Sequence, residues 1–375
     1  MNTTYFNTDL HNQPIVIDNG SCVLKAGFSG DLRPNILEYN VVGNLNKSNA
    51  LPTSSYRESY IGNEAQNLRI ILNLNYPFQN DRIEHWDEAE DIWNYILFSK
   101  LEVENIREHP ILLTESLVGS KSDKNKMCEI FYEKIGSPAL FTSNEFILSL
   151  YGVGRTTGCV VTSGHSFSGV TSIIDGQQLL PSTKINRISG HAVTEYLANQ
   201  LRNNHGILLN TTSDKELVRM LKERCCFVSP HTTNEKQNYH LFTSQQSPSN
   251  YKLPDGNVIT IQKEKFEVPE VLFQPRLIGS SEPSIQAMVN ASISEGGIEG
   301  FTKLSNSIIL GGGTTQLPGF SSRLLGELTT LFGSKTDINI YAPKERRFIC
   351  WIGGSVLTSL STMKYLWTTK EQWKE

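Results

Sequence analysis

The segment IVIDNGSCVLKAGFSG, residues 15–30, has two apolar runs on either side of the polar turn Asp-Asn-Gly-Ser. The two runs predict the strands of a β-hairpin. A glycine in such a turn accepts unusual backbone angles and lets consecutive amide N–H groups approach an anion such as phosphate. Lys25 follows Asp18 closely, so a tight hairpin would return its ammonium to the turn; a solvated surface lysine is the alternative.

Two further segments repeat the pattern of an apolar strand that enters a glycine turn. In GRTTGCVVTSGHSFSGV, residues 154–170, a strand over Cys159–Val161 enters a Ser-Gly turn, and Thr162 stands where the first segment has Asp18. In SIILGGGTTQLPGF, residues 307–320, the strand leads into consecutive glycines. Each turn alone is typical of an ordinary loop. Three of them after strands, two of which are similar, favour phosphate binding.

Strands and helices alternate along the first half of the chain, which predicts an α/β protein with two related lobes. The stretch HWDEAEDIWNYIL, residues 85–97, has the apolar spacing of an amphipathic helix, with Asp87 and Glu90 as its capping box. A second helix is expected over KSDKNKMCEIFYEKIG, and Gly136 would end it.

A third helix is predicted over TTSDKELVRMLKERCC, residues 211–226, with Ser213 and Glu216 as its capping box. Three charged residues of this helix share one face, at spacings of three and four: Arg219, Lys222 and Glu223. That face could bind a ribose and a purine, or it could be a solvated charged surface.

The composition of the 375-residue chain is that of a soluble globular protein, with 38% hydrophobic and 19% charged residues. A net charge of -4 at pH 7 argues against broad nucleic-acid binding and against a polybasic membrane patch. No apolar run reaches the roughly 18 residues of a membrane span, so we expect no direct membrane insertion. The 6 cysteines form no C-x-x-C pair, which fits the reducing cytosol or nucleus.

Longer motifs resemble the actin family and occur in that family's order along nearly the whole chain. They are VIDNGSCVLKAGFSGD, YIGNEAQ, HPILLTE, LSLYGVGRTTG, LVRMLKERCCFV, LPDGNVITI, LFQPRLIG, IILGGGTTQLPGF and APKERRFICWIGGSVLTSLST. The resemblance implies an α/β actin-like fold, of the superfamily that also contains sugar kinases and heat-shock ATPases. It implies two lobes and four subdomains around a nucleotide cleft, and ATP or ADP bound with Mg²⁺ or Ca²⁺.

The resemblance also implies boundaries for the four subdomains. Subdomain 1 would comprise residues 1–40, 77–151 and 349–375, subdomain 2 residues 41–76, subdomain 3 residues 152–188 and 281–348, and subdomain 4 residues 189–280.

Positions that match the family's nucleotide contacts fall in the three turns, on the helix over 211–226 and close to the third turn. They are Gly20, Ser21, Cys22, Val23, Lys25, Gly164, His165, Ser166, Arg219, Lys222, Glu223, Gly312, Gly313, Thr314, Gln316 and Arg347. Asp18 matches the residue that orders the cation's water shell.

The chain departs from the family where the terminal phosphate and the attacking water are held. The family usually has Asp at positions 162 and 165, Gln at 145 and His at 169; this chain has Thr162, His165, Glu145 and Gly169. Losing such groups typically costs a factor of about 10² or more in rate. Glu145 is a candidate base for the attacking water, although a carboxylate beside phosphate adds repulsion. We therefore expect weak or no hydrolysis, with a residual actin-type ATPase as the alternative.

The chain matches the family more closely at the surfaces through which the family polymerises than at the positions that hold the terminal phosphate. The segment NLNKSNALPTSSYRES, residues 44–59, corresponds to the loop that enters the neighbouring subunit, and it is more polar than that of actin, which suggests shorter or weaker filaments. The residues that match the receiving cleft are Tyr151, Gly154, Thr156, Leu357 and Leu360. Core packing is the alternative role for Tyr151, Leu357 and Leu360.

Finer features, HNQPIVIDNG, SPALFTSN and YLWTTKEQWKE, resemble the branch of the family that forms the short filament of dynactin. This resemblance implies self-assembly, contact with the shoulder, pointed-end and capping subunits of dynactin, an indirect link to dynein, and a cytoplasmic, cytoskeletal location. A nuclear actin-related scaffold of a chromatin-remodelling complex is the alternative. A sugar kinase is a third reading, but the sequence offers neither a substrate-side acid nor a sugar pocket.

Overall fold

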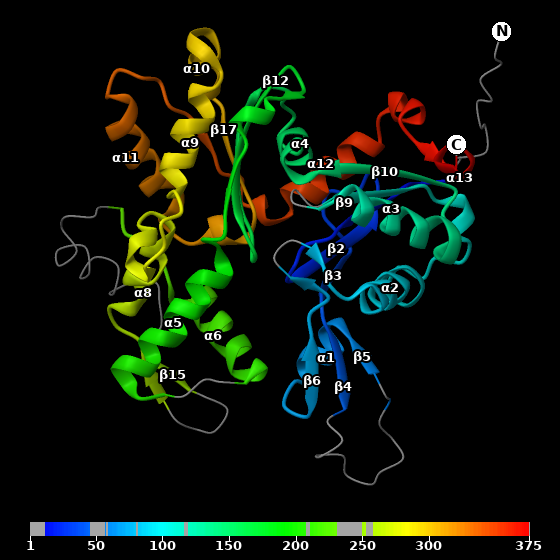
Figure 1. The fold of residues 1–375 in the computed structure, drawn as a ribbon, viewed down its shortest axis with the longest axis horizontal. Helices are drawn as coiled ribbons and strands as arrows, with labels where there is room; N and C mark the ends of the chain where they lie inside the picture. Colours follow the sequence, from blue (N-terminus) through cyan, green and yellow to red (C-terminus); the bar gives the residue numbers. More distant parts are fainter. Residues whose placement is uncertain are drawn as a thin grey trace. The chain divides into compact units, whose positions relative to one another are not determined.

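The computed structural model describes residues 12–45, 57, 59–79, 82–115, 119–207, 211–230, 250–252 and 258–374. The chain forms two compact units, one from Met1–Arg155 with Phe348–Glu375 and one from Thr156–Arg347. Each unit has its own mixed sheet with helices packed on it (Figure 1), which confirms the predicted α/β class with two lobes. The finer division into four subdomains stays a prediction. Among the described helices, none is long and apolar enough to cross a membrane.

The first unit is built on a six-stranded sheet in the order β19-β10-β9-β1-β2-β3. Its strands are β1 (Ile15–Asp18), β2 (Val23–Phe28), β3 (Ile36–Tyr39), β9 (Ile111–Glu115), β10 (Ala139–Asn144) and β19 (Thr368–Thr369). Strands β1, β9 and β10 run parallel, and the other pairs are antiparallel. The predicted hairpin of β1 and β2 is confirmed, with Asp18 opposite Lys25.

Several helices of the described residues accompany this sheet. They are α2 (Trp86–Asn94), α3 (Lys121–Glu129), α4 (Glu145–Tyr151), α12 (Ile349–Thr358) and α13 (Lys370–Lys374); π-helical turns over Tyr95–Lys100 and Ile130–Ile135 extend α2 and α3. Gly136, in the left-handed region at φ 89°, ends the second of these as predicted. The capping box predicted at Asp87 and Glu90 is wrong, because α2 begins at Trp86 after His85. Asp87 instead lies in the first turn, where its charge favours the helix dipole.

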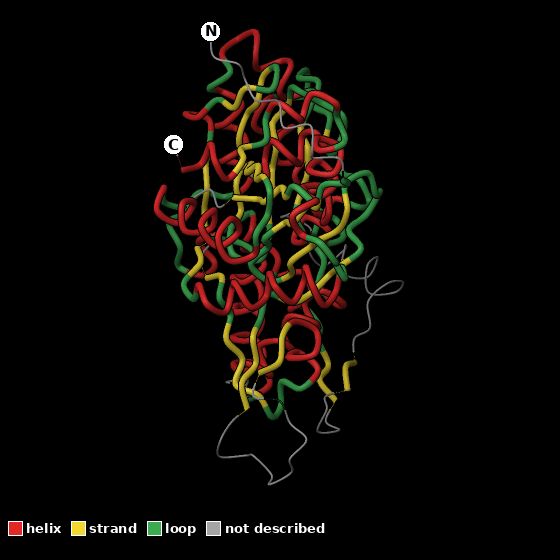
Figure 2. The backbone as a smooth tube through the Cα atoms, turned by 90° about the vertical axis from the view of Figure 1, so that its right-hand side faces the viewer, coloured by secondary structure: helices red, strands yellow, loops and turns green. Residues whose placement is uncertain are grey.

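A small antiparallel sheet in the order β5-β4-β6 completes the first unit, and its strands lie side by side in Figure 2. Its elements are β4 (Val42–Leu45), β5 (Ser59–Ile61), α1 (Gly62–Asn67) and β6 (Leu72–Asn75), followed by the two-residue strands β7 (Phe78–Gln79) and β8 (Arg82–Ile83). Glu38 of β3 joins it to the large sheet, because its carboxylate accepts a hydrogen bond from Asn63 N (2.6 Å) and pairs with Lys100 (3.0 Å).

The second unit contains a six-stranded sheet in the order β13-β12-β11-β17-β18, with β14 paired to β12. Its strands are β11 (Gly158–Ser163), β12 (Ser168–Ile174), β13 (Gln177–Gln178), β14 (Lys184–Asn186), β17 (Ile308–Gly311) and β18 (Ile340–Tyr341). Strand β11 pairs antiparallel with β12 and parallel with β17, so the second and third glycine turns follow neighbouring strands. Strands β15 (Asn250–Lys252) and β16 (Val258–Thr260) form a separate antiparallel pair.

The helices described in the second unit are α5 (Gly190–His205), α6 (Thr212–Cys225), α8 (Glu264–Glu267), α9 (Ile285–Ser294), α10 (Gly297–Ser305) and α11 (Phe320–Phe332). Helix α9 packs along β12, and α5 packs against α6 (Figure 1). The capping box of α6 is formed by Thr211 and Asp214, not by the predicted Ser213 and Glu216. The carboxylate of Glu216 is instead bonded to Arg219.

Candidate functional site

The first glycine turn holds a buried ion pair. Asp18 ends β1 and is 6% exposed, and its Oδ2 lies 2.8 Å from the Nζ of Lys25. A Cβ on Gly20 would lie 2.9 Å from that Nζ and 2.4 Å from the carbonyl oxygen of Val23. The ammonium is therefore at the turn, as the tight-hairpin prediction requires, and Lys25 is not a solvated surface residue.

Lys25 stays charged in this setting. Burial lowers the pKa of its ammonium, but the charge of Asp18 and the hydrogen bond to it outweigh burial and raise the pKa overall; Glu145 adds a smaller effect in the same direction. The turn thus presents a cation whose charge does not depend on pH in the neutral range.

Side chains from other elements hold the turn in place. The Oγ1 of Thr114, on β9, accepts a hydrogen bond from Asn19 N (2.8 Å), and Trp93 Nε1 donates to Asn19 Oδ1 (2.9 Å). Asn40 Nδ2 donates to the carbonyl oxygen of Gly20 (3.0 Å). Sequence reasoning missed all of these. Only Thr114 had a signal, as the polar residue near the end of a buried strand.

Glu145 lies at the same edge of the sheet as Asp18. It is the first residue of α4, directly after β10, and the parallel strands β1, β9 and β10 end together at that edge. Asn144 caps the helix by accepting from Ile147 N (3.1 Å). Two carboxylates with Lys25 near both of them are a set that can order the water shell of a divalent cation.

In the second turn, which lies in the other unit, the carbonyl oxygens of Gly164 and His165 accept hydrogen bonds from the third turn and from the start of α5. Gly164 O accepts from Thr314 Oγ1 (2.7 Å) and from Gly190 N (3.0 Å). His165 O accepts from Ser189 Oγ (2.6 Å) and from His191 N (2.8 Å).

The amides of this turn consequently face the other way. The C=O and N–H of a trans peptide point in opposite directions. The amides of His165 and Ser166 therefore point away from α5 and from the third turn, as an anion-binding turn requires. Thr162, in the strand before the turn, is 3% exposed and lies between Gly169 and Gly311 of the neighbouring strands.

The third turn packs directly on the second. Gly312 has φ 84°, and a Cβ there would lie 2.3 Å from Ser163 O. Arg346 supports the turn, since its Nε donates to Thr315 Oγ1 (3.1 Å) and its Nη2 to Thr315 O (2.8 Å). The side-chain amide of Gln316, a predicted nucleotide contact, donates to Lys344 O (2.8 Å).

The two neighbouring arginines of this region differ in setting. Arg347, the residue predicted from the sequence, is exposed, whereas Arg346 is half-buried and holds the third turn. The sequence alone gave no means of telling which arginine faces inward. Gly313, next to Gly312, is exposed and has open space where a Cβ would stand.

Two of the three residues on the charged face of α6, Arg219 and Lys222, are buried, whereas Glu223 is exposed. Lys222 is 6% exposed, and its Nζ donates to Gly190 O (2.8 Å) and to Thr194 Oγ1 (3.0 Å). Arg219 is 7% exposed; it donates to both oxygens of Glu216 and, at 2.5 Å, to Glu223. Lys222 thus connects the start of α5 to α6. The partner of Arg219 is Glu216, which the sequence analysis had assigned to the helix cap.

His165 is surrounded by cationic and neutral groups. Its ring lies against that of His191, with centroids 5.4 Å apart. Burial, followed by the charges of Lys222, His191 and Arg219, lowers the pKa of His165 to about 3. The imidazole is therefore neutral at pH 7.

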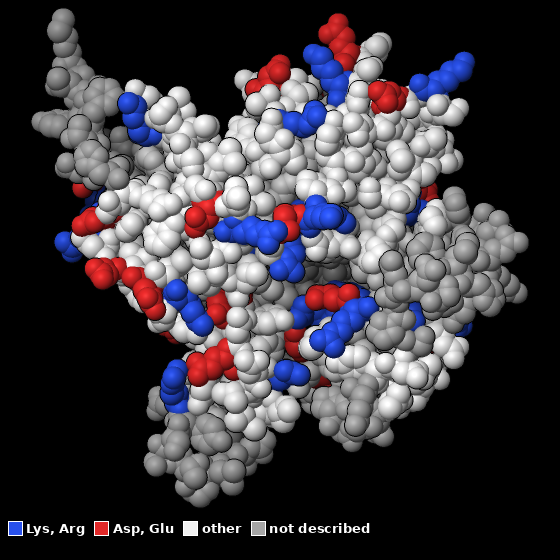
Figure 3. Space-filling view, turned by 180° about the vertical axis from the view of Figure 1, so that it is seen from behind, with Lys and Arg blue, Asp and Glu red and all other residues white. Residues whose placement is uncertain are grey.

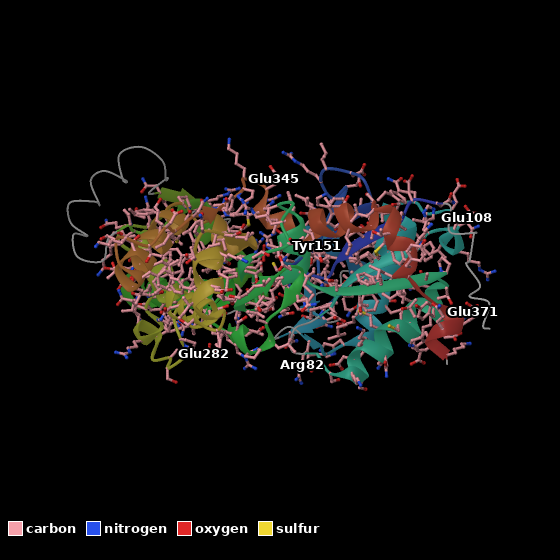
Figure 4. All side chains as sticks on the ribbon, turned by 90° about the horizontal axis from the view of Figure 1, so that it is seen from above. Arg82, Glu108, Tyr151, Glu282, Glu345 and Glu371 are labelled. Atoms are coloured by element: carbon pink, nitrogen blue, oxygen red, sulfur yellow. The ribbon has the colours of Figure 1, made fainter. Side chains whose placement is uncertain are left out.

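The predicted assembly residues occupy several settings. Tyr151 is the last residue of α4, labelled in Figure 4, and Gly154 has φ 68°. Leu357 is half-buried against the cluster that contains Trp351, while Leu360 is 51% exposed. Thr156 is the first residue of the second unit. Most of the loop predicted to enter a neighbour, residues 46–56 and 58, lies outside the described residues.

Close packing sets the position of α12. A Cβ on Gly353 would lie 1.7 Å from the carbonyl oxygen of Leu148 on α4, so the two helices meet backbone to backbone.

On the face in Figure 3, basic and acidic side chains are interspersed among the other described residues.

Comparisons with known proteins agree with the resemblance. The pattern of the family described as Actin matches residues 9–375. The chain is 42% identical over 366 residues to the protein named Centractin from Saccharomyces cerevisiae, covering 98% of this chain and 95% of that protein. It is 38% identical over 366 residues to Centractin from Schizosaccharomyces pombe, covering 97% and 95%. An Actin-like protein from Neurospora crassa is 36% identical over 370 residues, covering 98% and 96%.

Proposed function

Because this chain belongs to the actin family, we propose that it binds ATP or ADP and polymerises into a short filament, the backbone of dynactin in dynein-driven transport. The supporting observation is the extent of the similarity, since two proteins named Centractin align with at least 97% of the chain. The proposed partners are other copies of this chain and the shoulder, pointed-end and capping subunits of dynactin, with dynein contacted indirectly. The proposed location is the cytoplasm and its cytoskeleton.

The nucleotide is proposed to be held by the three glycine turns and by α6. Lys25 supplies a cation at the first turn. The amides of His165 and Ser166 face away from the bonds that hold the second turn. Lys222 gives structural support, because its ammonium is bonded to Gly190 O and Thr194 Oγ1.

The donor set of the first unit fits a hydrated Mg²⁺ or Ca²⁺. Asp18 and Glu145 place two carboxylates at one sheet edge. Mg²⁺ keeps several of its waters in protein sites, and we propose that both carboxylates act through such waters. When bound, the cation would offset the negative charge of the phosphates. Among the residues described, no three His, Cys, Asp or Glu side chains are grouped to hold a metal directly.

We propose that hydrolysis is slow. The second turn carries Thr162 and His165, neither of which supplies a negative charge that could order the cation's waters. Removing one water-positioning group typically costs a factor of about 10² or more. Glu145 sits beside the Asp18–Lys25 pair, where a role with the cation competes with its candidate role as a base.

Purification of the tagged chain from its own cells tests the assembly. We expect short filaments of uniform length by negative-stain electron microscopy, together with dynactin shoulder and capping subunits by mass spectrometry. Cytoplasmic or cortical spots are expected for the fluorescent fusion. A nuclear signal with chromatin-remodelling subunits and no filaments would contradict the proposal.

A further inference from the structure

We propose that this protein takes up a proton together with the nucleotide, and that the imidazole of His165 receives that proton and donates a hydrogen bond to a phosphate oxygen. The inference rests on the proposed nucleotide binding and adds a regulation to it, since nucleotide affinity would rise as the pH falls.

The backbone around His165 is held firmly. Its carbonyl oxygen accepts bonds from Ser189 Oγ (2.6 Å) and His191 N (2.8 Å), and the preceding carbonyl accepts from Thr314 Oγ1 (2.7 Å). His165 therefore belongs to the turn whose amides are proposed to face phosphate. The Cα of His165 lies between the amides of His165 and Ser166, so its side chain begins next to both of them.

In the described part of the second unit, the imidazole has no acceptor from the protein. Among the described residues of this unit, none makes a hydrogen bond or ion pair with a ring nitrogen of His165, whose ring contact is with His191 (5.4 Å between centroids). A phosphate oxygen would supply the acceptor that the ring lacks.

The charged groups around the ring favour its neutral form until an anion arrives. From α6 come Lys222 and Arg219, and from α5 comes His191. The nearby carboxylates are engaged elsewhere: Glu216 and Glu223 bond Arg219, and Glu195 pairs with Lys215 at 3.2 Å. The third turn contributes no charged residue between Gly312 and Gln316.

A bound phosphate reverses this balance. The pKa of His165, lowered to about 3 by burial and by the surrounding cations, must rise when an anion binds beside it. An opposite charge within hydrogen-bonding distance typically moves a pKa by about 1 to 3. For a rise of about 2 to 3, linkage makes the affinity about 2-fold to 10-fold greater at pH 5.0 than at pH 7.5. The effect is present at low pH and is lost as the pH rises through the pKa of the bound state.

The test is nucleotide affinity against pH in the full chain, measured by competition of ATP with a fluorescent ATP analogue in the presence of EDTA. The variant is His165→Gln, which keeps a hydrogen-bond donor but cannot take up a proton. Protonation of ATP itself affects both proteins equally and cancels in their ratio. We expect the ratio of wild-type to variant affinity to rise about 2-fold to 10-fold between pH 7.5 and 5.0.

His191→Gln is the matched control, because it removes the neighbouring imidazole and is expected to keep the pH dependence. Calorimetry of the wild type at pH 5.5, in two buffers with different ionisation enthalpies, measures the proton uptake directly. Parallel pH profiles for wild type and His165→Gln, or no proton uptake, would overturn the inference while leaving nucleotide binding intact. Loss of the pH dependence in His191→Gln alone would contradict the assignment to His165. A wild type that binds no nucleotide at any pH would overturn the proposed function itself.

Discussion

Replacing Gly312 by alanine tests how the second and third turns are joined. Gly312 has φ 84° and ψ 153°, a region that only glycine adopts readily. A Cβ at this position would lie 2.3 Å from Ser163 O, 2.6 Å from its carbonyl carbon and 2.9 Å from its nitrogen. All three obstructing atoms are backbone, so no side-chain rotation can relieve the clash, and the two turns must separate.

The expected loss of stability has two parts. Holding alanine in this backbone region costs about 1–3 kcal/mol, and overpacking adds about 1–3 kcal/mol. The free energy of unfolding of the second unit should therefore fall by about 2–6 kcal/mol. A change of 1 kcal/mol shifts the melting temperature of a domain of 150–250 residues by about 2–4 °C, so we expect a decrease of at least about 4 °C.

Gly313→Ala is the matched control for this measurement, because a Cβ there meets nothing within 4 Å. Melting is followed by scanning calorimetry of the nucleotide-free protein, since both glycines are proposed nucleotide contacts and bound ligand adds stability by mass action. The control should stay within about 0.5 kcal/mol of the wild type. Equal melting temperatures for the two variants would refute the reasoning about turn contact.

Two other substitutions test the buried cations. Asp18→Asn removes the carboxylate that pairs with Lys25 and should lower the free energy of unfolding by about 3 kcal/mol in a denaturant titration. The double variant Asp18→Asn, Lys25→Met should recover part of that loss. Because the folded-state pKa of Lys25 is raised, wild-type stability from this pair is complete below about pH 10.4 and is lost at higher pH, a loss that the double variant should not show. Lys222→Met removes two hydrogen bonds from a charged donor, to Gly190 O and to Thr194 Oγ1, and should cost about 1–3 kcal/mol, although Gly190 O keeps its bond from Thr194 Oγ1. Lys215→Met on the same helix, whose ion pair is exposed, should cost about 0.5 kcal/mol or less. Equal losses for Lys222→Met and Lys215→Met would contradict the supporting role of Lys222.

Local turn chemistry could be predicted from the sequence. The hairpin of β1 and β2, the helix end at Gly136 and the strand that leads into the third turn depend on residues close together in the chain. In each of them glycine or a short polar run permits a backbone conformation that few other residues adopt.

Helix starts were less predictable, because the capping pattern is degenerate. The start of α6 contains two overlapping patterns, Thr211 with Asp214 and Ser213 with Glu216, and both satisfy the spacing rule. The structure uses the first pair, and Glu216 then pairs with Arg219. Which pair caps the helix depends on the residue at which the helix begins. The spacing of the capping residues alone does not specify that residue.

The supporting contacts of the site could not be predicted, because they join residues far apart in sequence. Asn19 meets Thr114 and Trp93, and Gly164 meets Gly190 and Thr314. The nucleotide contact expected of Arg347 stays a prediction. The support that its neighbour Arg346 gives to the third turn could not be predicted either, because the sequence does not show which of the two arginines is buried. Burial decides between such neighbours, and burial follows from the folded sheet.

The central claim is that this chain binds adenine nucleotide but turns it over slowly. The most direct measurement purifies the protein through gel filtration without added nucleotide, identifies the retained nucleotide by chromatography of the denatured sample, and follows phosphate release during polymerisation beside conventional actin. We expect close to one adenine nucleotide per chain and phosphate release slower than that of actin by a factor of about 10². A chain that emerges without nucleotide, or one that releases phosphate at the rate of actin, would contradict the account.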